Sequence, residues 1–496
     1  MILYMDKAEV PDVEALSPEV LRYVVTRSER AAGRYNRLES YYRGEHPSLR
    51  GKGADEEVRV AVNYAKYVVD TGLGYYLGEG VKYDPNERSH RKKTKIDLRP
   101  LLRCYDEQHI SEVDQEIGRQ TATFGDCLEL CYASSAEDPL PRSACIDPRC
   151  GVLVCDATVE HNKLFAILWE KREKVSGEKY YAVTVYTDRT VKHFRGGDLK
   201  TLFQVGDTLP HYFGAVPVIA YENNPQRQGD FEQIIPLMDA YNTLMSDRLT
   251  DKRRFVDALL VFFGMSLREG DEGRLAREKF LDGAPLDARA EYIQKTFDEA
   301  GIQVLADALV REMHKMTLTV DMSDEHFAGN SSGQALKLKL LTMNLMVKNK
   351  MRRMEKGLRE RLSLYSGWLA VKGEMEAVEG SEVDVVFTVN MPIDEAAALE
   401  LVTRLQGIVD EQTLLSQLWF IRDPAEALEN IRAQRAREKG GNEDDRTGTA
   451  QGAGTARGAG EEPESRDGAG GDSGSGAAAG GAGGSENRSG RGASRL

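Results

Sequence analysis

The chain has 496 residues, with 80 acidic and 66 basic side chains and a formal net charge of -14. A protein whose main surface bound nucleic-acid phosphates would be basic, so this charge leaves room only for local contacts with DNA or RNA. Aromatic residues make up 7%, which disfavours a base-stacking module, and the longest apolar run, residues 258–265, is too short for a transmembrane helix. We expect a cytosolic protein without a secretory signal, because the first residues lack a basic start followed by an apolar stretch.

The N-terminal half of the chain predicts a helical arm followed by an α+β region. Residues 17–43 carry apolar and aromatic side chains at helical spacing, and with the loop after them they form a first region, 1–59. The loop contains GKG, but a phosphate-binding loop needs a glycine where His46 stands, which excludes a nucleotide site there. Residues 60–229 combine helix-like apolar faces with short β-prone runs separated by Gly, Pro and Asp, which predicts an α+β domain.

Helical periodicity starts at Asp230. Asp230 and Gln233 have the spacing of a capping box, and apolar residues then recur until Gly264, which predicts a first long helix over 230–263. A charged segment, 264–298, predicts one short helix and one strand. A second helix is expected within 299–320, so the two helices can form an antiparallel hairpin with a small domain at its tip.

The sequence pattern of the remaining chain predicts a loop at 321–333, a long helix and a strand within 334–393, and two helices within 394–437. Residues 438–496 are rich in glycine and poor in large apolar side chains, so we expect a disordered tail.

The hairpin cannot bury its apolar stripes by itself. Either strands of the same chain cover these stripes, or copies of the chain arranged in a ring cover them by a head-to-tail contact. The pattern leaves both possibilities open. The candidate residues for such a contact are Tyr241, Met245, Leu249, Leu259, Leu305 and Leu309.

The segment from Lys337 to Arg361 is unusually basic for this chain, with nine basic and two acidic residues. It could contact DNA, pair with acidic neighbouring subunits, or form a solvated helix face. The candidate residues are Lys337, Lys348, Arg352 and Lys356.

Motifs of catalysis are missing from the sequence: it has no HExxH, no phosphate-binding loop and no nucleophile elbow, so we expect no enzyme and no cofactor. Acidic residues of the 321–333 loop could bind Mg²⁺ in a nuclease, but such clusters are more often solvated or cap a helix, and His326 is a loop residue rather than a general base. The six cysteines, all between Cys104 and Cys155, lack the CxxC spacing of zinc sites and are expected to be reduced thiols.

Five sequence blocks carry a family pattern in the same order. The blocks are NYAKYVVDTGLGYYLGEGVKY (63–83), FGDCLELCYA (124–133), VPVIAYENNPQRQGDFEQIIPLMDAYNTLMSD (216–247), SSGQALKLKL (331–340), and the stretch with Asn390, Pro392 and Asp410–Thr413. Over residues 35–435 the chain resembles the portal proteins of tailed double-stranded DNA bacteriophages, in the Gp6-like siphophage branch. The glycine-rich tail and the cysteine group are not assigned by this resemblance.

The resemblance implies a portal fold of the α+β class, with a β-rich wing (60–229), stem helices (230–263 and 299–320), an α/β clip (264–298), a tunnel loop (321–333), a long wing helix and strand (334–393) and a helical crown (394–437). It implies that Asp321, Asp324, Glu325, His326 and Asn330 face a channel.

The resemblance also implies a homo-dodecameric ring at one capsid vertex of the virion, assembled in the host cytoplasm, through which double-stranded DNA enters and leaves. Implied partners are further copies of the chain, the terminase large subunit, a head-completion adaptor, and the major capsid and scaffolding proteins. Two alternatives are a ring-forming head-tail adaptor or capsid protein without its own DNA channel, and a packaging or nuclease enzyme.

Overall fold

The structure is a computed structural model. It describes residues 1–49, 58–86, 96–255, 259–263, 289–293, 299–321, 338, 340–389, 400, 402–416, 418, 421, 424 and 427–435. The chain divides into two compact units, Met1–Glu395 and Ala396–Leu496, which are described separately.

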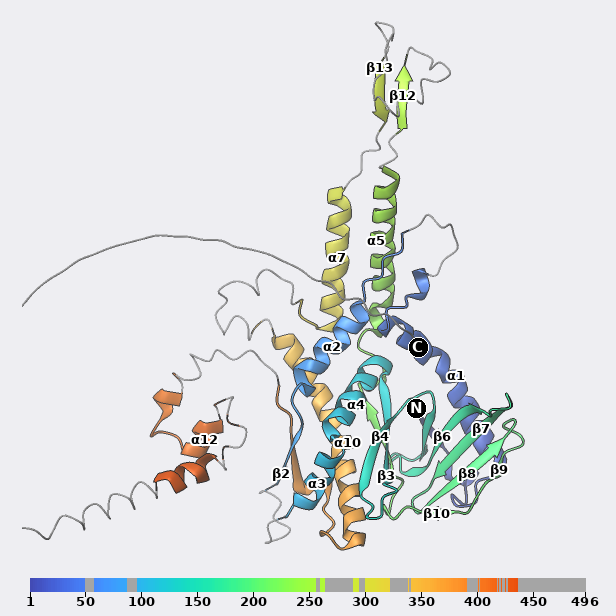
Figure 1. The fold of residues 1–496 in the computed structure, drawn as a ribbon, viewed down its shortest axis with the longest axis vertical. Helices are drawn as coiled ribbons and strands as arrows, with labels where there is room; N and C mark the ends of the chain where they lie inside the picture. Colours follow the sequence, from blue (N-terminus) through green and yellow to red (C-terminus); the bar gives the residue numbers. More distant parts are fainter. Residues whose placement is uncertain are drawn as a thin grey trace, which may run out of the picture. The chain divides into compact units, whose positions relative to one another are not determined.

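The first unit contains a mixed seven-stranded sheet covered on one face by the N-terminal helix (Figure 1). Ser17 caps α1 (Pro18–Tyr42), and the apolar stripe of this helix packs on the sheet, which confirms the predicted helical arm. The strands run in the order β1-β5-β6-β7-β8-β10, with β9 paired to β8. Their bounds are β1 Ile2–Met5, β5 Gly151–Asp156, β6 Lys163–Glu173, β7 Lys179–Tyr186, β8 Thr190–Gly196, β9 Phe203–Gln204 and β10 Leu209–Pro210.

The opposite face of this sheet packs against a three-stranded antiparallel sheet through a shared apolar cluster. The strands of the smaller sheet are β11 (Val218–Glu222), β3 (Asp126–Ala133) and β4 (Pro141–Ile146). The long α10 packs on β11 and closes the largest apolar core of the protein. The α+β class expected from the sequence is therefore present.

Helices and a two-stranded sheet surround α10. Their bounds are α2 Tyr64–Leu77, α3 Arg99–Glu107, α4 Ile110–Phe124, α10 Leu341–Lys372, β2 Lys82–Pro85 and β14 Val383–Val386. Gly125 ends α4 with a φ of 89°, and a Cβ at this position would lie 2.0 Å from the carbonyl oxygen of Arg227, so only glycine fits. Short 3-10 helices connect the elements at Lys7–Glu9, Pro47–Leu49, Glu232–Ile234 and Gly380–Glu382.

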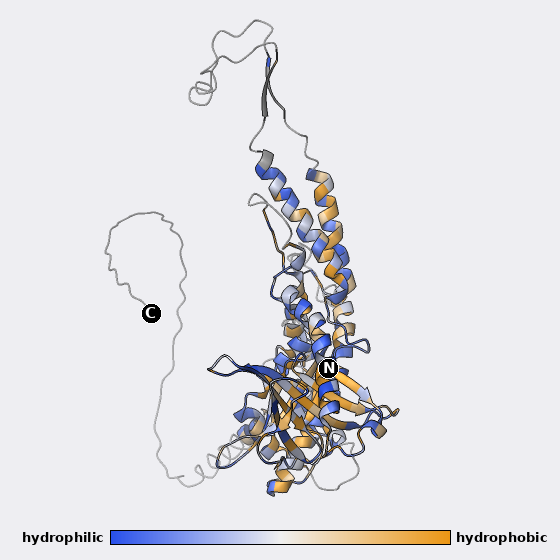
Figure 2. Ribbon diagram, turned by 90° about the vertical axis from the view of Figure 1, so that its right-hand side faces the viewer, coloured by the Kyte–Doolittle hydropathy of each residue, from blue (hydrophilic) through white to orange (hydrophobic). Residues whose placement is uncertain are grey.

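Two helices, α5 (Ile235–Phe255) and α7 (Glu299–Thr317), lie side by side beyond the sheets (Figure 1). Both mix hydrophilic and hydrophobic residues along their length (Figure 2). The second predicted helix is confirmed, but the prediction of one helix continuing to Phe263 is wrong. Residues Leu259–Phe263 form β12, which pairs with β13 (Arg289–Ile293), because the run LLVFF of branched and aromatic residues suits a strand as well as a buried helix.

The other expected elements are described in part. The predicted strands near residues 290 and 383 are present as β13 and β14, whereas the short helix predicted between residues 264 and 288 lies outside the described residues. In the second unit the structure describes α12 (Glu411–Ser416) and helical residues at 402–405 and 427–435. Asp410 caps α12, since its carboxylate accepts a hydrogen bond of 2.9 Å from the Thr413 amide.

Candidate functional site

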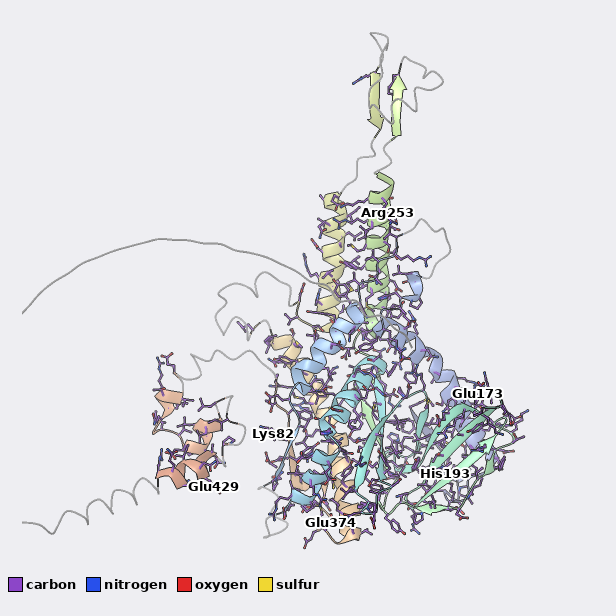
Figure 3. The ribbon with its side chains drawn as sticks, in the orientation of Figure 1. Lys82, Glu173, His193, Arg253, Glu374 and Glu429 are labelled. Carbon is purple, nitrogen blue, oxygen red and sulfur yellow. The ribbon has the colours of Figure 1, made fainter. Side chains whose placement is uncertain are left out.

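The helix hairpin of α5 and α7 is antiparallel and is held by charged side chains. Arg248 of α5 donates to the side-chain oxygen of Gln303 at 3.0 Å, and both Arg248 and Lys252 donate to Glu299 at the start of α7. These hydrogen bonds lower the pKa of Glu299 below its usual value. Figure 3 shows Arg253 near the C-terminal end of α5. Charged side chains therefore join the end of α5 to the start of α7.

Apolar side chains on the hairpin are exposed. The exposed fractions are 40% for Leu249, 70% for Val304 and 51% for Leu305. Of the stem residues expected from the sequence, Leu249 and Leu305 thus face solvent in the single chain. Tyr241, Met245 and Leu309 are half-buried.

Leu259 lies in β12, so its assignment to the stem helix is wrong; the LLVFF run that contains it pairs as a strand with β13.

An extended segment of the chain runs along α5 and is bound by polar side chains one helical turn apart. The backbone amides of Val58, Val60 and Val62 donate to the side-chain oxygens of Thr250, Ser246 and Asn242, at 3.1, 3.0 and 2.9 Å. The side chains of Asn242, Ser246 and Thr250 are all buried. Sequence reasoning missed this role, although the four-residue spacing of the three polar side chains Asn242, Ser246 and Thr250 is a signal that could have indicated it.

An aromatic cluster joins the hairpin to α2. The rings of Tyr64 and Tyr241 meet edge to face at 5.5 Å, and His314 of α7 contacts both Tyr64 and Tyr67. The Tyr67 hydroxyl donates to the carbonyl of Val320 at 3.0 Å, next to Asp321. Burial, followed by the neighbouring Tyr241, raises the pKa of Tyr64. The chain leaving α7 is therefore held against α2.

Asp321 is the one channel candidate within the described residues, and its carboxylate lies 3.8 Å from the His314 ring nitrogen Nε2. The candidates Asp324, Glu325, His326 and Asn330 lie outside the described residues.

Asp230 does not cap a helix, so the predicted capping box is wrong. Its carboxylate pairs with Lys350 of α10 and accepts a hydrogen bond of 2.8 Å from the Asn223 amide group. The 3-10 helix before α5 starts at Glu232, and α5 starts at Ile235. The local spacing predicted that Asp230 caps a helix. Its carboxylate instead binds Lys350, 120 positions later in the chain.

The basic segment divides into buried and exposed cations. Lys350 and Arg361 are buried in ion pairs, whereas Lys348, Arg352 and Lys356 are exposed along one side of α10. Lys337 lies outside the described residues. The candidates Lys348, Arg352 and Lys356 thus lie on the surface. Because Lys350 and Arg361 are buried, the basic segment as a whole is not a solvated helix face.

Arg361 forms a buried ionic centre that ties α10 to the sheets and helices. Its guanidinium donates to Asp114 of α4 at 2.5 Å, to Glu129 of β3 at 3.1 Å and to the Tyr83 hydroxyl at 3.2 Å. Burial alone would lower the pKa of Arg361, but the two carboxylates raise it well above its usual value. The Tyr221 hydroxyl donates to Glu129 at 2.6 Å. The network fixes the position of α10 in the core.

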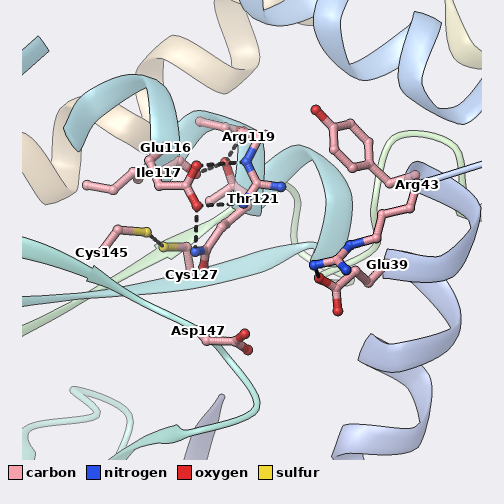
Figure 4. Close-up of polar contacts among 12 residues, drawn as sticks. Glu39, Arg43, Glu116, Ile117, Arg119, Thr121, Cys127, Cys145 and Asp147 are labelled. Carbon is pink, nitrogen blue, oxygen red and sulfur yellow. Dashed lines mark hydrogen bonds and ion pairs between the residues drawn. The ribbon is translucent and has the colours of Figure 1, made fainter. Parts of the chain in front are cut away.

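Cysteines lie in the smaller sheet and its surroundings. The thiols of Cys127 and Cys145 point toward each other across β3 and β4 at 3.2 Å, next to the ion pair of Glu116 and Arg119 (Figure 4). Burial raises the pKa of Cys127 well above its usual value, so this side chain is a neutral thiol at neutral pH. Among the residues that the structure describes, no group of three His, Cys, Asp or Glu side chains could hold a metal ion.

In the described part of the chain, no helix has the length and apolar character needed to cross a membrane.

Comparisons with known proteins relate most of the chain to one family. A family model described as phage portal protein, SPP1 Gp6-like, matches residues 21–441. The portal protein of Bacillus phage SPP1 is 22% identical over 311 residues, which cover 56% of this chain and 59% of that protein. The match thus spans less than two thirds of the length of this curated relative. Among solved structures, the neck of an empty GTA particle computed with C6 symmetry is similar, with a TM-score of 0.41, 12% identity, and coverage of 71% of this chain and 88% of that chain.

Proposed function

This chain belongs to the SPP1 Gp6-like family of phage portal proteins, and on that premise we propose that its copies form a closed ring at one capsid vertex, with an axial channel for double-stranded DNA. We propose a dodecamer, and a location in the virion after assembly in the host cytoplasm. The observation that carries the proposal is the exposed apolar surface of the α5–α7 hairpin.

The apolar surface of the hairpin needs a partner. Leu249, Val304 and Leu305 belong to two adjacent helices and are 40% to 70% exposed. Because burying a leucine stabilises a protein by about 1.5–3 kcal/mol, a contact that covers these side chains favours association. A head-to-tail contact that closes by rotation covers the same surface in every copy and produces a ring.

The acidic net charge of the chain favours a channel that lets DNA pass over one that binds DNA tightly. Every phosphate that a protein neutralises adds affinity, so a basic channel would hold the duplex in place. With a net charge of -14, the chain as a whole repels phosphates. An acidic ring therefore suits a conduit through which DNA slides in both directions.

We assign the regions of the chain to the parts of a portal protein on the basis of the family. We propose that residues 60–229 and 334–393 form the wing, α5 and α7 the stem, the segment with β12 and β13 the clip, residues 321–333 the tunnel loop and residues 394–437 the crown. The clip would bind the terminase large subunit during packaging and the head-completion adaptor afterwards, and the wing would meet the major capsid and scaffolding proteins. In this role the chain is a structural component and performs no catalysis.

Electron microscopy of the purified full-length protein tests the proposal. End-on views should show closed rings of about twelve subunits with an axial opening wide enough for a DNA duplex. Closed rings without such an opening would favour an adaptor or capsid component, and separate single chains at every concentration would refute the ring. Cleavage of DNA in the presence of Mg²⁺ or hydrolysis of ATP by the pure protein would instead favour an enzyme.

A further inference from the structure

One side of α10 is exposed along about four turns and carries two kinds of side chain. We call this side, together with Leu338 just before the helix, the α10 stripe. It consists of Leu338, Leu341, Leu345, Lys348, Arg352 and Lys356. The steps of three and four residues place Leu341, Leu345 and the three cations on one side of the helix. The leucines occupy the N-terminal half of the stripe and the cations the C-terminal half.

The leucines of the stripe are exposed in the single chain. Their exposed fractions are 72% for Leu338, 50% for Leu341 and 56% for Leu345, whereas the nearby Met343 and Val347 are buried in the core. Contiguous exposed apolar residues on a soluble protein mark an interaction surface more often than scattered single ones do. The N-terminal half of the stripe therefore has the character of a protein interface.

The cations of the stripe differ from the other cations of this helix in their contacts. Among the described residues, Lys348, Arg352 and Lys356 form no ion pair or side-chain hydrogen bond, although all three are exposed. The other basic residues of α10 behave differently. Lys350 pairs with Asp230, Arg353 with Glu222, Arg359 with Glu355, and Arg361 with Asp114 and Glu129.

We propose that the α10 stripe binds a second copy of this chain, on a face that combines carboxylates with apolar side chains. This inference rests on the proposed ring and names a contact outside the hairpin. Double-stranded DNA would satisfy the three cations but would leave the three leucines uncovered, so a protein partner fits the whole stripe better. Another copy is complementary in charge, since the chain carries 14 more acidic than basic residues.

Suitable carboxylates are present on the same unit. Glu79, after the end of α2, and Glu112, in the first turn of α4, are both exposed and have no ion pair in the part of the chain that the structure describes. They come from neighbouring segments, because a Cβ on Gly80 would lie 3.9 Å from the Cβ of Ser111. A contact of the stripe with these acids of another copy joins two different patches of the surface, and such a contact closes into a ring when it is head-to-tail.

Charge reversal in the full-length chain tests the proposal. The variant Lys348→Glu/Arg352→Glu/Lys356→Glu is compared with Arg22→Glu/Arg30→Glu/Lys200→Glu, which changes the net charge equally at three exposed cations elsewhere. Mass photometry at fixed salt gives the protein concentration at which half of the chains are assembled. We expect this concentration to rise about tenfold or more for the stripe variant and less than twofold for the control.

A second pair of variants tests the apolar half without changing the charge. We expect Leu341→Ser/Leu345→Ser to weaken assembly, whereas Leu209→Ser, at a site 52% exposed on β10, should have no such effect. Circular dichroism reports whether each variant is folded. Because every substituted side chain is exposed, we expect the spectra to match that of the unchanged protein.

Three results would overturn the proposal. In the first, both stripe variants assemble at the same concentration as their controls. In the second, they assemble normally but lose retention of duplex DNA, which would make the stripe a nucleic-acid contact. In the third, the unchanged protein forms no rings, which refutes the proposed function together with this contact; the first two results leave the proposed function standing.

Discussion

Lys350 in α10 and Asp230 before α5 form an ion pair inside the protein, with side chains that are 8% and 7% exposed. The pair connects the long helix of the α+β body to the base of the helix hairpin. A charge in this position is tolerated only because its partner is present, since an isolated buried charge is strongly unfavourable. The base of the hairpin is therefore joined to the body by a contact between residues 120 positions apart.

Removing one partner of this pair should destabilise the chain strongly. We expect Lys350→Met to lower the free energy of unfolding by about 3–5 kcal/mol, because it leaves Asp230 buried without a cation. Lys356→Met on the exposed side of the same helix should change it by less than about 0.5 kcal/mol. Urea denaturation followed by circular dichroism measures both. Equal, small effects would mean that Asp230 is solvated in solution.

Substitution by alanine should have opposite effects on stability at two glycines that lie in helices. A Cβ on Gly357 of α10 would lie 2.2 Å from the Tyr221 ring, so Gly357→Ala should cost about 1–3 kcal/mol through overpacking. No atom lies within 4 Å of a Cβ built on Gly33 of α1, so Gly33→Ala should stabilise the helix by about 0.5–1 kcal/mol. Melting temperatures of the two variants check this. A stabilising Gly357→Ala would show that α10 does not pack on β11 as described.

Glu14 should make stability depend on pH in the acid range. Burial alone would raise its pKa, but hydrogen bonds from Lys192, Thr187 and Thr190 lower the pKa from 4.5 to about 2. A lowered pKa in the folded state gives stability that is complete above the unfolded value and is lost as the pH falls toward 2. Because the side chain is about a third exposed, we expect Glu14→Gln to cost only about 1 kcal/mol at pH 7.

The difference between Glu14→Gln and the unchanged protein should stay constant from pH 7 to about 5 and shrink between about 4.5 and 2. Glu9→Gln, which removes a carboxylate at an exposed site, provides the control. Unfolding free energies measured at several pH values give the profile. A difference that grows on acidification would mean that folding raises the pKa of Glu14 instead of lowering it.

Acidic substitutions on the hairpin should prevent assembly without unfolding the chain. We expect Leu249→Asp/Leu305→Asp to shift the sedimentation coefficient from that of a ring toward that of a single chain, because both side chains are exposed in the single chain and would be covered by the contact that we propose for the ring. Leu209→Asp introduces one substitution of the same kind at an exposed site of the sheet and should leave rings intact. Unchanged ring sedimentation of the hairpin variant would refute the stem assignment.

Local periodicity predicted much of the helical structure. The bounds of α1 and α7 agree with the prediction, since their apolar stripes have regular helical spacing and recognisable ends. The error in α5 came from Leu259–Phe263, where five consecutive apolar residues fit either structure. In the structure these residues form a strand because they pair with β13, about 30 residues later in the chain.

The roles of charged residues could not be predicted in the same way. Asp230 has the local spacing of a helix cap, and Arg361 lies in a charge run typical of a solvated face. In the structure both are buried, because Lys350, Asp114 and Glu129 reach them from distant parts of the chain. Such pairs form only through tertiary packing, which a pattern of neighbouring residues in the sequence does not predict.

The mass of the full-length protein under native conditions tests the central claim most directly. Native mass spectrometry should find assemblies near twelve times the chain mass of 55.2 kDa. A spectrum that contains only species of one chain mass, recorded for folded protein over a wide concentration range, would contradict the account.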